Sequence, residues 1–145
     1  MIFRAGKMHY EELEEIWERS VRATHNFLTE KDIASIKKEI PLYFNEVEIY
    51  CTKNNDEKIT GFIGIAEKKI EMLFIDPEYF RESLGKSLVK YVLENKGIDE
   101  VDVNEQNEKA LKFYQYMGFE VVSRDEFDSM GNPFPILHMK IKKMV

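Results

Sequence analysis

The chain has 145 residues, of which 43% are hydrophobic and 12% aromatic, enough for one domain, residues 1–145, with a substantial core. The formal net charge of −6 argues against a nucleic-acid partner, because phosphate binding needs a basic surface. The single cysteine, Cys51, excludes a disulfide framework and a zinc site built from several cysteines.

The first half of the chain predicts a short strand, two helices and three strands. Residues 2–5 are extended, and residues 9–24 carry apolar side chains at helical spacing with acids on the other face. Thr29, with Asp32 three residues on, predicts the start of a second helix, which Pro41 ends or kinks. The next strands are expected at residues 47–51, 59–66 and 70–75, and their short connections indicate an antiparallel meander.

The second half changes pattern. Helices are expected at residues 82–94 and 107–117, and strands at 99–104, 119–124 and 136–141. A strand, a crossover helix and a strand imply parallel neighbours. The predicted fold class is therefore α/β, or α+β with a mixed sheet.

The stretch from Ile70 to Phe119 carries the residues most suggestive of chemistry. Glu71 interrupts an apolar strand, where it must be exposed at a cleft or have a partner. Strict alternation would put Glu71, Leu73 and Ile75 on one face. A carboxylate in a cleft can take the proton of an alkylammonium group, which is not nucleophilic until it loses that proton. The alternative is a surface or salt-bridged glutamate.

Four segments together resemble the GNAT superfamily of acyl-CoA N-acyltransferases, and within it small bacterial members of the YjaB type. These segments are Thr24-His25-Asn26-Phe27-Leu28, Ile70-Glu71-Met72-Leu73-Phe74, Val101-Asp102-Val103-Asn104-Glu105-Gln106-Asn107 and Gly131-Asn132-Pro133-Phe134-Pro135, and the run Asn107-x-x-Ala110-x-x-Phe113-Tyr114-x-x-Met117-Gly118-Phe119 adds a fairly specific ending. The resemblance implies a mostly antiparallel sheet with one splayed parallel pair and flanking helices. It also implies an N-acetyltransferase that uses acetyl-CoA and a small amine or peptide acceptor, and the lack of a signal peptide or membrane-spanning run in the sequence leads us to expect a cytoplasmic protein.

One motif departs from the superfamily. Its pyrophosphate loop reads Arg/Gln-x-x-Gly-x-Gly/Ala, and aligning the last position to Gly85 puts Phe80 and Ser83 at the first two. The free N–H groups of a helix start can still bind an anion, because they do not depend on side-chain identity. Lys86 and Arg81 can supply positive charge. The Cβ of Ser83 crowds a phosphate, whereas its hydroxyl can bond one.

The resemblance implies roles for individual residues. Glu71 would be the base, and Tyr114 would protonate the departing thiolate, unless Tyr114 is only a core aromatic. The implied cofactor contacts are Leu73, Phe74, Ile75, Arg81, Glu82, Ser83, Leu84, Gly85, Lys86, Asn104, Asn107 and Ala110. Two of these have an alternative role, because Asn107 can cap a helix and Asn104 can close a turn.

Three aromatic or imidazole side chains are candidate substrate contacts: His25 and Phe27 between the first two helices, and His138 on the last strand. His25 can instead bond the backbone at its helix end. The three histidines show no metal-ligand spacing, so we expect no metal. Cys51 is expected to be a core thiol rather than a nucleophile.

The sequence also bears on membrane association, surface charge, activity and oligomeric state. The opening residues, 1–6, are too short and polar for a signal peptide, and no apolar run approaches the ~20 residues that span a bilayer, so we expect no membrane partner. The acidic balance fits an ordinary surface or a cleft that attracts cationic amines. The degenerate loop leaves a catalytically weak or inactive acyl-CoA-binding or protein-interaction domain as the alternative. The chain can be a monomer or a homodimer.

Overall fold

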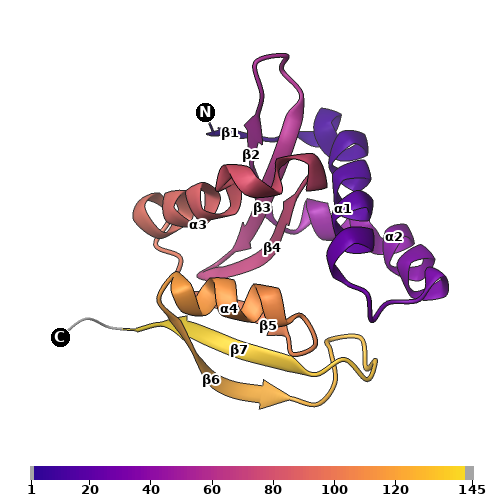
Figure 1. Ribbon diagram of the computed structural model, residues 1–145, viewed down its shortest axis with the longest axis vertical. Coiled ribbons are helices and arrows are strands. Elements are labelled where there is room, and N and C mark those ends of the chain that lie inside the picture. The colour runs from indigo at the N-terminus through magenta and orange to yellow at the C-terminus, as the bar shows by residue number, and fades with distance from the viewer. Residues whose placement is uncertain (1, 143–145) are drawn as a thin grey trace.

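The computed structural model describes residues 2–142, apart from the side chain of Arg81. Its seven strands form one sheet in the order β1-β2-β3-β4-β5-β7-β6 (Figure 1). Only β4 and β5 are parallel, and all other neighbours are antiparallel. The mixed sheet predicted from the sequence is therefore confirmed.

The elements follow the predicted order closely. The strands are β1 (Ile2–Arg4), β2 (Glu48–Lys53), β3 (Ile59–Ala66), β4 (Lys69–Ile75), β5 (Glu100–Asn104), β6 (Phe119–Asp125) and β7 (Ile136–Ile141). The helices are α1 (Tyr10–Thr24), α2 (Glu30–Asn45), α3 (Leu84–Asn95) and α4 (Glu108–Tyr116), with 3₁₀ turns η1 (Lys7–His9) and η2 (Pro77–Glu82). Among the described helices, none is long and apolar enough to cross a membrane.

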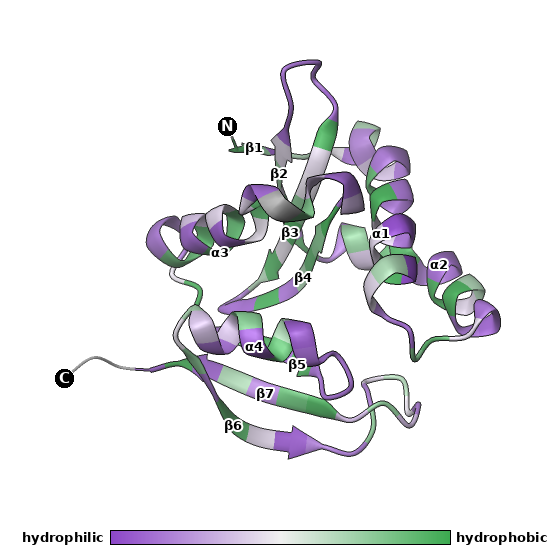
Figure 2. Ribbon diagram, in the orientation of Figure 1, coloured by the Kyte–Doolittle hydropathy of each residue, from purple (hydrophilic) through white to green (hydrophobic). Residues whose placement is uncertain are grey.

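A helix pair covers each face of the sheet. One buried cluster joins α3 and α4 to the sheet through Leu88, Val92 and Val101. The other joins α1 and α2 to it through Leu13 and Phe44, both fully buried. Figure 2 shows hydrophobic residues concentrated on β3 and β4, the strands that both helix pairs enclose. Burial of these apolar surfaces is the main term that stabilises the fold.

The start of α2 confirms its predicted cap, whereas of the two effects predicted for Pro41, ending or kinking the helix, the first is wrong. The Thr29 hydroxyl accepts from the Asp32 N–H at 3.1 Å, and the Asp32 carboxylate accepts from the Thr29 N–H at 3.0 Å. Pro41 does not end the helix, which continues to Asn45. Proline removes one backbone hydrogen bond, but burial of Ile40 and Phe44 against the sheet keeps this last turn helical.

The strands β4 and β5 pair over only two residues. Lys69 lies opposite Glu100 and Ile70 opposite Val101, and beyond this point the strands separate. Figure 1 shows α3 and α4 on either side of the line along which they separate. Backbone groups on the facing edges of β4 and β5 are therefore open to a ligand.

A β-bulge in β4 falls at Glu71. Ile70 lies opposite Ile65 of β3 and Met72 opposite Gly64, so Glu71 is the extra residue. The bulge moves Leu73 to the α3–α4 face, whereas Met72 packs with the α1–α2 cluster. The prediction that Glu71 shares its face with Leu73 and Ile75 is therefore wrong, because it assumed unbroken alternation.

Candidate active site

Three cavities follow one another along β4. The large cavity has about 640 Å³ and lies between α3, α4 and the end of α1. The small cavity, about 120 Å³, lies between the separated ends of β4 and β5. The third, here called the acidic cavity, has about 370 Å³ and lies between α2 and β4. Phe74 lines all three, so the cavities adjoin one another around this strand.

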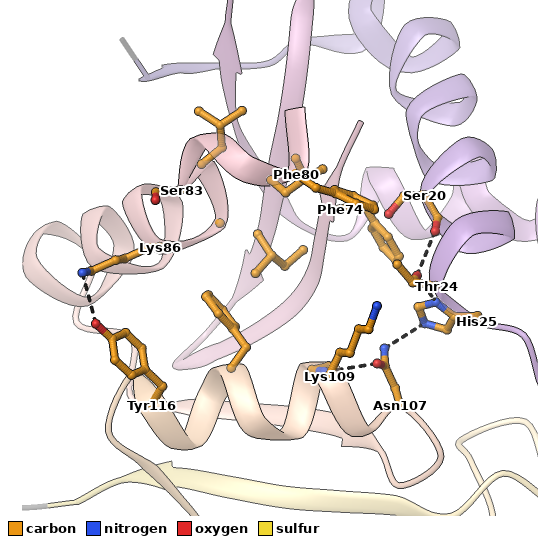
Figure 3. Close-up of a pocket in the computed structure, with 16 residues that line it drawn as sticks. Ser20, Thr24, His25, Phe74, Phe80, Ser83, Lys86, Asn107, Lys109 and Tyr116 are labelled. Atoms are coloured by element: carbon orange, nitrogen blue, oxygen red, sulfur yellow. Dashed lines mark hydrogen bonds between the residues drawn. The ribbon is translucent and has the colours of Figure 1, made fainter. Parts of the chain in front are cut away.

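Most of the predicted cofactor contacts meet in the large cavity (Figure 3). Its described lining includes two lysines, Lys86 and Lys109, and no carboxylate. In a chain of net charge −6, this local balance favours an anionic ligand. The predicted residues that line it are His25, Leu73, Phe74, Ile75, Ser83, Leu84, Gly85, Lys86, Asn107 and Ala110.

The start of α3 presents free backbone donors to this cavity. Ser83 precedes the helix and its side chain makes no capping hydrogen bond. The first helical bond runs from the Ser87 N–H to the Ser83 carbonyl at 3.1 Å. The N–H groups of Leu84, Gly85 and Lys86 therefore have no partner within the helix, and all three residues line the large cavity. Such a helix start is suited to an anion.

Ser83 adopts the left-handed backbone conformation, with φ 58° and ψ 26°. Ser83 occupies the place where the superfamily motif has its first glycine, and glycine is the residue that adopts this conformation without a steric cost. A Cβ in this region costs about 1–2 kcal/mol. At Gly85, by contrast, an added Cβ would make only ordinary contacts, the nearest at 3.6 Å from Phe113.

We expect Ser83→Gly to stabilise the protein by about 1 kcal/mol and to raise Tm by about 2–4 °C, because it relieves the left-handed strain. The unused side-chain hydroxyl loses no cap. Thermal unfolding followed by circular dichroism measures the change. Gly85→Ala is the matched control, since its φ is ordinary and its Cβ has room. A lower Tm for Ser83→Gly would show that the hydroxyl stabilises the loop more than the strain destabilises it.

The turn that leads to α3 is fixed to α1. Asp76, 1% exposed, accepts from the Arg19 guanidinium at 2.6 Å and from the Glu78 backbone N–H at 3.1 Å. A buried carboxylate with both oxygens bonded holds its surroundings in one geometry. The end of β4 and the approach to α3 are thereby fixed relative to the opposite helix pair.

A directed chain of hydrogen bonds connects the end of α1 to the start of α4 (Figure 3). The Thr24 hydroxyl donates to the Ser20 carbonyl at 2.8 Å, so its oxygen accepts from Nδ1 of His25, also at 2.8 Å. Burial lowers the pKa of His25, which keeps the ring neutral with Nε2 unprotonated. Nε2 therefore accepts from the Asn107 amide at 3.3 Å, and the Asn107 oxygen accepts from the Ala110 N–H at 3.1 Å.

These hydrogen bonds bear on the two roles predicted for Asn107, a cofactor contact and a helix cap. Asn107 caps α4, as the helix-cap reading predicted, and its amide group still faces the large and small cavities. His25 lines the same two cavities. Its backbone N–H bonds the Val21 carbonyl, as expected at a helix end, while its ring bonds the two side chains.

Tyr114 lines the small cavity from α4 and is only 5% exposed. Its ring packs edge-on against Phe113 and Phe119, with centroids 5.0 and 5.5 Å away. Burial raises the pKa of the Tyr114 phenol well above 10, so the hydroxyl remains protonated at neutral pH. Tyr114 is therefore a core aromatic that also borders a cavity, and its role toward the thiolate stays a prediction.

Glu71 lines both the small and the acidic cavity. Loss of solvent around it raises the pKa of its carboxyl, an effect that Lys69 opposes and the charge of Asp102 reinforces. None of the ion pairs among the described residues includes Glu71. The salt-bridged alternative is therefore not what the structure has, whereas the exposure of Glu71 fits the surface alternative as well as a cleft. A raised pKa brings a carboxylate closer to the range useful for a base.

Other predicted site residues lie elsewhere. Glu82 is exposed and lines none of the three cavities. Asn104 lines the small cavity and also closes a turn, since its side chain accepts from the Gln106 N–H at 2.9 Å. Phe27 packs between His25 and Phe134, with centroids 5.3 and 6.0 Å away. The side chain of Arg81 lies outside the described part of the chain.

His138 lies in an ion cluster on the last three strands. Its Nδ1 is 2.6 Å from the Asp102 carboxylate and its Nε2 is 2.7 Å from Asp125. Both ring nitrogens therefore donate, which requires the charged imidazolium. Hydrogen bonds to Asp125 and then Asp102 raise the pKa of His138. Lys69 shares Asp102 at 3.0 Å. A substrate contact by His138 stays a prediction.

The His138 cluster predicts a pH-dependent stability. Because the folded-state pKa is raised, its contribution is fully present below pH ~6.5 and is lost as pH rises through the folded-state value. We expect His138→Gln to lower Tm by a few degrees at pH 6 and by clearly less at pH 9. Thermal unfolding of both proteins across this range measures it. A Tm difference that does not vary with pH would contradict the charged cluster.

The sequence reading missed several residues that line the cavities. Phe80, Lys109 and Tyr116 line the large cavity, and Glu46 lines the acidic one. Lys109 could have been predicted from the sequence, since it adjoins Ala110 in the motif that resembles the superfamily. Glu46 could not have been predicted, because no sequence motif relates the end of α2 to β4, which lies far from it in the chain.

Two expectations on reactive groups can be compared with the structure. Cys51 is fully buried, and burial raises the pKa of its thiol to about 12, which confirms a core thiol. Within residues 2–142, no group of three or more histidine, cysteine, aspartate or glutamate side chains is arranged to hold a metal ion.

Comparison with known proteins places these cavities in context. A family model described as an acetyltransferase (GNAT) domain matches residues 11–143. The peptidyl-lysine N-acetyltransferase YjaB of Salmonella typhimurium is 35% identical over 129 residues, 89% of each chain. The solution structure of apo-form YjaB from Escherichia coli has a TM-score of 0.90 at 32% identity and covers 99% of this chain and 98% of that one.

A more distant structure shares the fold. The PaiA N-acetyltransferase of Thermoplasma acidophilum, solved in complex with coenzyme A, has a TM-score of 0.75 at 24% identity. The match covers 98% of each chain.

Proposed function

The chain belongs to the GNAT acetyltransferase family and is an acyltransferase, and from this premise we propose that it transfers the acetyl group of acetyl-CoA to the side-chain amine of a lysine. The relatives named peptidyl-lysine N-acetyltransferases cover most of this chain and support that acceptor. The observation that carries the proposal is the series of cavities along β4, with lysines at one end, Tyr114 in the middle and Glu71 toward the other end.

The large cavity fits acetyl-CoA. The free N–H groups at the start of α3 and the ammonium of Lys86 suit the pyrophosphate. The unpaired edge of β4 at Leu73 to Ile75 offers backbone groups to the pantetheine arm. The thioester would then enter the small cavity between β4 and β5, where Tyr114 lies.

Direct transfer of the acetyl group from the thioester to the amine gives Glu71 and Tyr114 their proposed roles. The amine nitrogen attacks the thioester carbonyl carbon, a C–N bond forms, and the C–S bond breaks. The proton lost by the amine passes to the Glu71 carboxylate, directly or through water. The sulfur leaves as a thiolate, toward which the Tyr114 hydroxyl donates. Cys51 has no part, because direct transfer needs no covalent enzyme intermediate.

Calorimetric titration with acetyl-CoA tests the cofactor part of the proposal. We expect micromolar binding of acetyl-CoA and of CoA, and no binding of S-acetyl-N-acetylcysteamine, a thioester without a nucleotide. Thiol release with lysine-containing peptides then tests transfer. Absence of binding at millimolar acetyl-CoA would mean that Phe80 and Ser83 have disabled the loop, and would favour a non-catalytic interaction domain.

A further inference from the structure

The acidic cavity differs in character from the large one. Its described lining includes two carboxylates, Glu46 and Glu71, and no cation. None of the described ion pairs includes Glu46, which lies at the end of α2 with its backbone N–H bonded to the Tyr43 carbonyl at 3.0 Å. The two carboxylates are close enough for the charge of Glu46 to raise the pKa of Glu71. The described lining of the cavity is thus acidic, and the cation that acts on Glu71, Lys69, lies outside this lining and bonds Asp102.

Aromatic and aliphatic side chains form the rest of its wall. Trp17, Tyr43 and Phe74 line it together with Met72. Aromatic faces attract cations, and apolar walls accept methylene groups. An aromatic wall with two carboxylates suits an ammonium group on an alkyl chain, and suits an anion or a purely apolar ligand less well.

The surroundings of Tyr43, which lines the cavity, are also acidic. The pKa of Tyr43 is raised first by burial and then by the charges of Glu39, Asp128 and Glu46. The Tyr43 hydroxyl bonds the sulfur of Met130 at 3.0 Å, which places the β6–β7 connection against α2. Carboxylates from two distant parts of the chain are therefore close enough to Tyr43, a lining residue, to raise its pKa, and would attract a cation to this side of the cavity.

The acidic cavity adjoins the groups that would perform the proposed transfer. Glu71, Met72 and Phe74 line both the acidic and the small cavity. A chain that enters from the α2 side therefore brings its amine to Glu71, on the side of β4 away from the lysine-lined large cavity. The two substrates would approach the small cavity from opposite ends.

We propose that the acidic cavity binds the acceptor as an unbranched alkylammonium group, with Glu46 as a specificity-determining residue. This inference rests on the proposed function and names the site of its acceptor. Glu46 attracts and holds the cation, the aromatic wall packs on its methylene chain, and Glu71 takes its proton. The lysine side chain and a free diamine share this chemistry.

The test uses Glu46→Gln, which keeps the size of the side chain and the backbone contact at the helix end. Glu94→Gln is the matched control, because Glu94 is exposed on α3, lines none of the cavities and changes the net charge equally. Acceptor kinetics are measured at saturating acetyl-CoA with Nα-acetyl-lysine N-methylamide and with 1,5-diaminopentane. We expect Glu46→Gln to raise the acceptor KM about tenfold with kcat within twofold of the parent.

A second readout does not need turnover. Trp17 is the chain's only tryptophan and lines the cavity, so its fluorescence reports occupancy without acetyl-CoA. We expect a saturable change with the lysine amide, a weaker response in Glu46→Gln, and none with the uncharged isostere Nα-acetyl-norleucine N-methylamide. A tighter response to the amide than to the diamine supports a protein lysine, and the reverse supports a free diamine.

The outcomes separate this inference from the proposed function. An unchanged KM in Glu46→Gln, or equal responses to the lysine and norleucine probes, would overturn the cation site even if the enzyme acetylates lysine. A parent protein that acetylates no amine would overturn the proposed function, while the Trp17 titration would still decide whether the cavity binds an alkylammonium group.

Discussion

Tyr114→Phe is expected to lower kcat by about 10²- to 10³-fold while the Kd for acetyl-CoA changes less than twofold. The substitution removes one oxygen and keeps the ring that packs against Phe113 and Phe119. Stopped-flow or steady-state thiol release measures kcat, and calorimetry measures Kd. Tyr91→Phe is the control, because Tyr91 packs on Tyr50 at 5.3 Å and lines none of the cavities.

The raised pKa of Tyr114 bears on the role that we propose for its hydroxyl. A phenol with pKa above 10 transfers its proton only uphill to a thiolate, whose conjugate acid has a pKa near ~8.5. In the proposed mechanism, Tyr114 would therefore stabilise the leaving thiolate mainly by donating a hydrogen bond as the charge develops. Equal kcat in Tyr114→Phe and the parent would remove the hydroxyl from the mechanism and leave Tyr114 as a core aromatic.

The local signals in the sequence were enough to predict most of the fold. Apolar spacing predicted α1, α3 and α4, the Thr29–Asp32 cap predicted the start of α2, and the short connections predicted the antiparallel meander. These features depend on neighbours a few residues away, which a sequence displays directly. Pro41 shows the limit, since its effect on α2 was decided by burial of Phe44 against a distant sheet.

Glu71 shows a second limit. Its candidate role was predicted, but its face was not, because a bulge interrupts the alternation on which the prediction rested. A bulge depends on pairing with β3, and nothing in the residues of β4 marks it. The same bulge places the Glu71 carboxylate at both the small and the acidic cavity. The irregularity that made the predicted face of Glu71 wrong therefore also gives Glu71 its place in the candidate site.

Ser83 illustrates the opposite case. The sequence presented it as a departure from a glycine motif, yet the backbone keeps the left-handed conformation that such a glycine would favour. The N–H groups of the next residues depend on that conformation and not on the side chain. Contacts between distant segments, such as that of His25 with Asn107, could not be predicted, because neither segment by itself indicates its partner.

The second large effect is expected from Glu71→Gln. Without the carboxylate, only the small unprotonated fraction of an alkyl amine reacts, so kcat at pH 7.5 and saturating acceptor should fall by about 100-fold. The remaining rate should rise about tenfold per pH unit toward the amine pKa near ~10. In the parent, the raised pKa of Glu71 places the acidic limb of the pH–rate profile above the usual glutamate range.

Glu67→Gln is the control that separates base chemistry from a general change of field. Glu67 raises the pKa of Glu71 by its charge alone and lines neither the small nor the acidic cavity. Its replacement should move the acidic limb slightly to lower pH and leave kcat at pH 7.5 intact. Glu71 also lines the acidic cavity, so its replacement raises the acceptor KM as well, and kcat at saturation is the quantity that reports the base. A Glu71→Gln protein with the parent's kcat and pH profile would assign the carboxylate to acceptor binding alone.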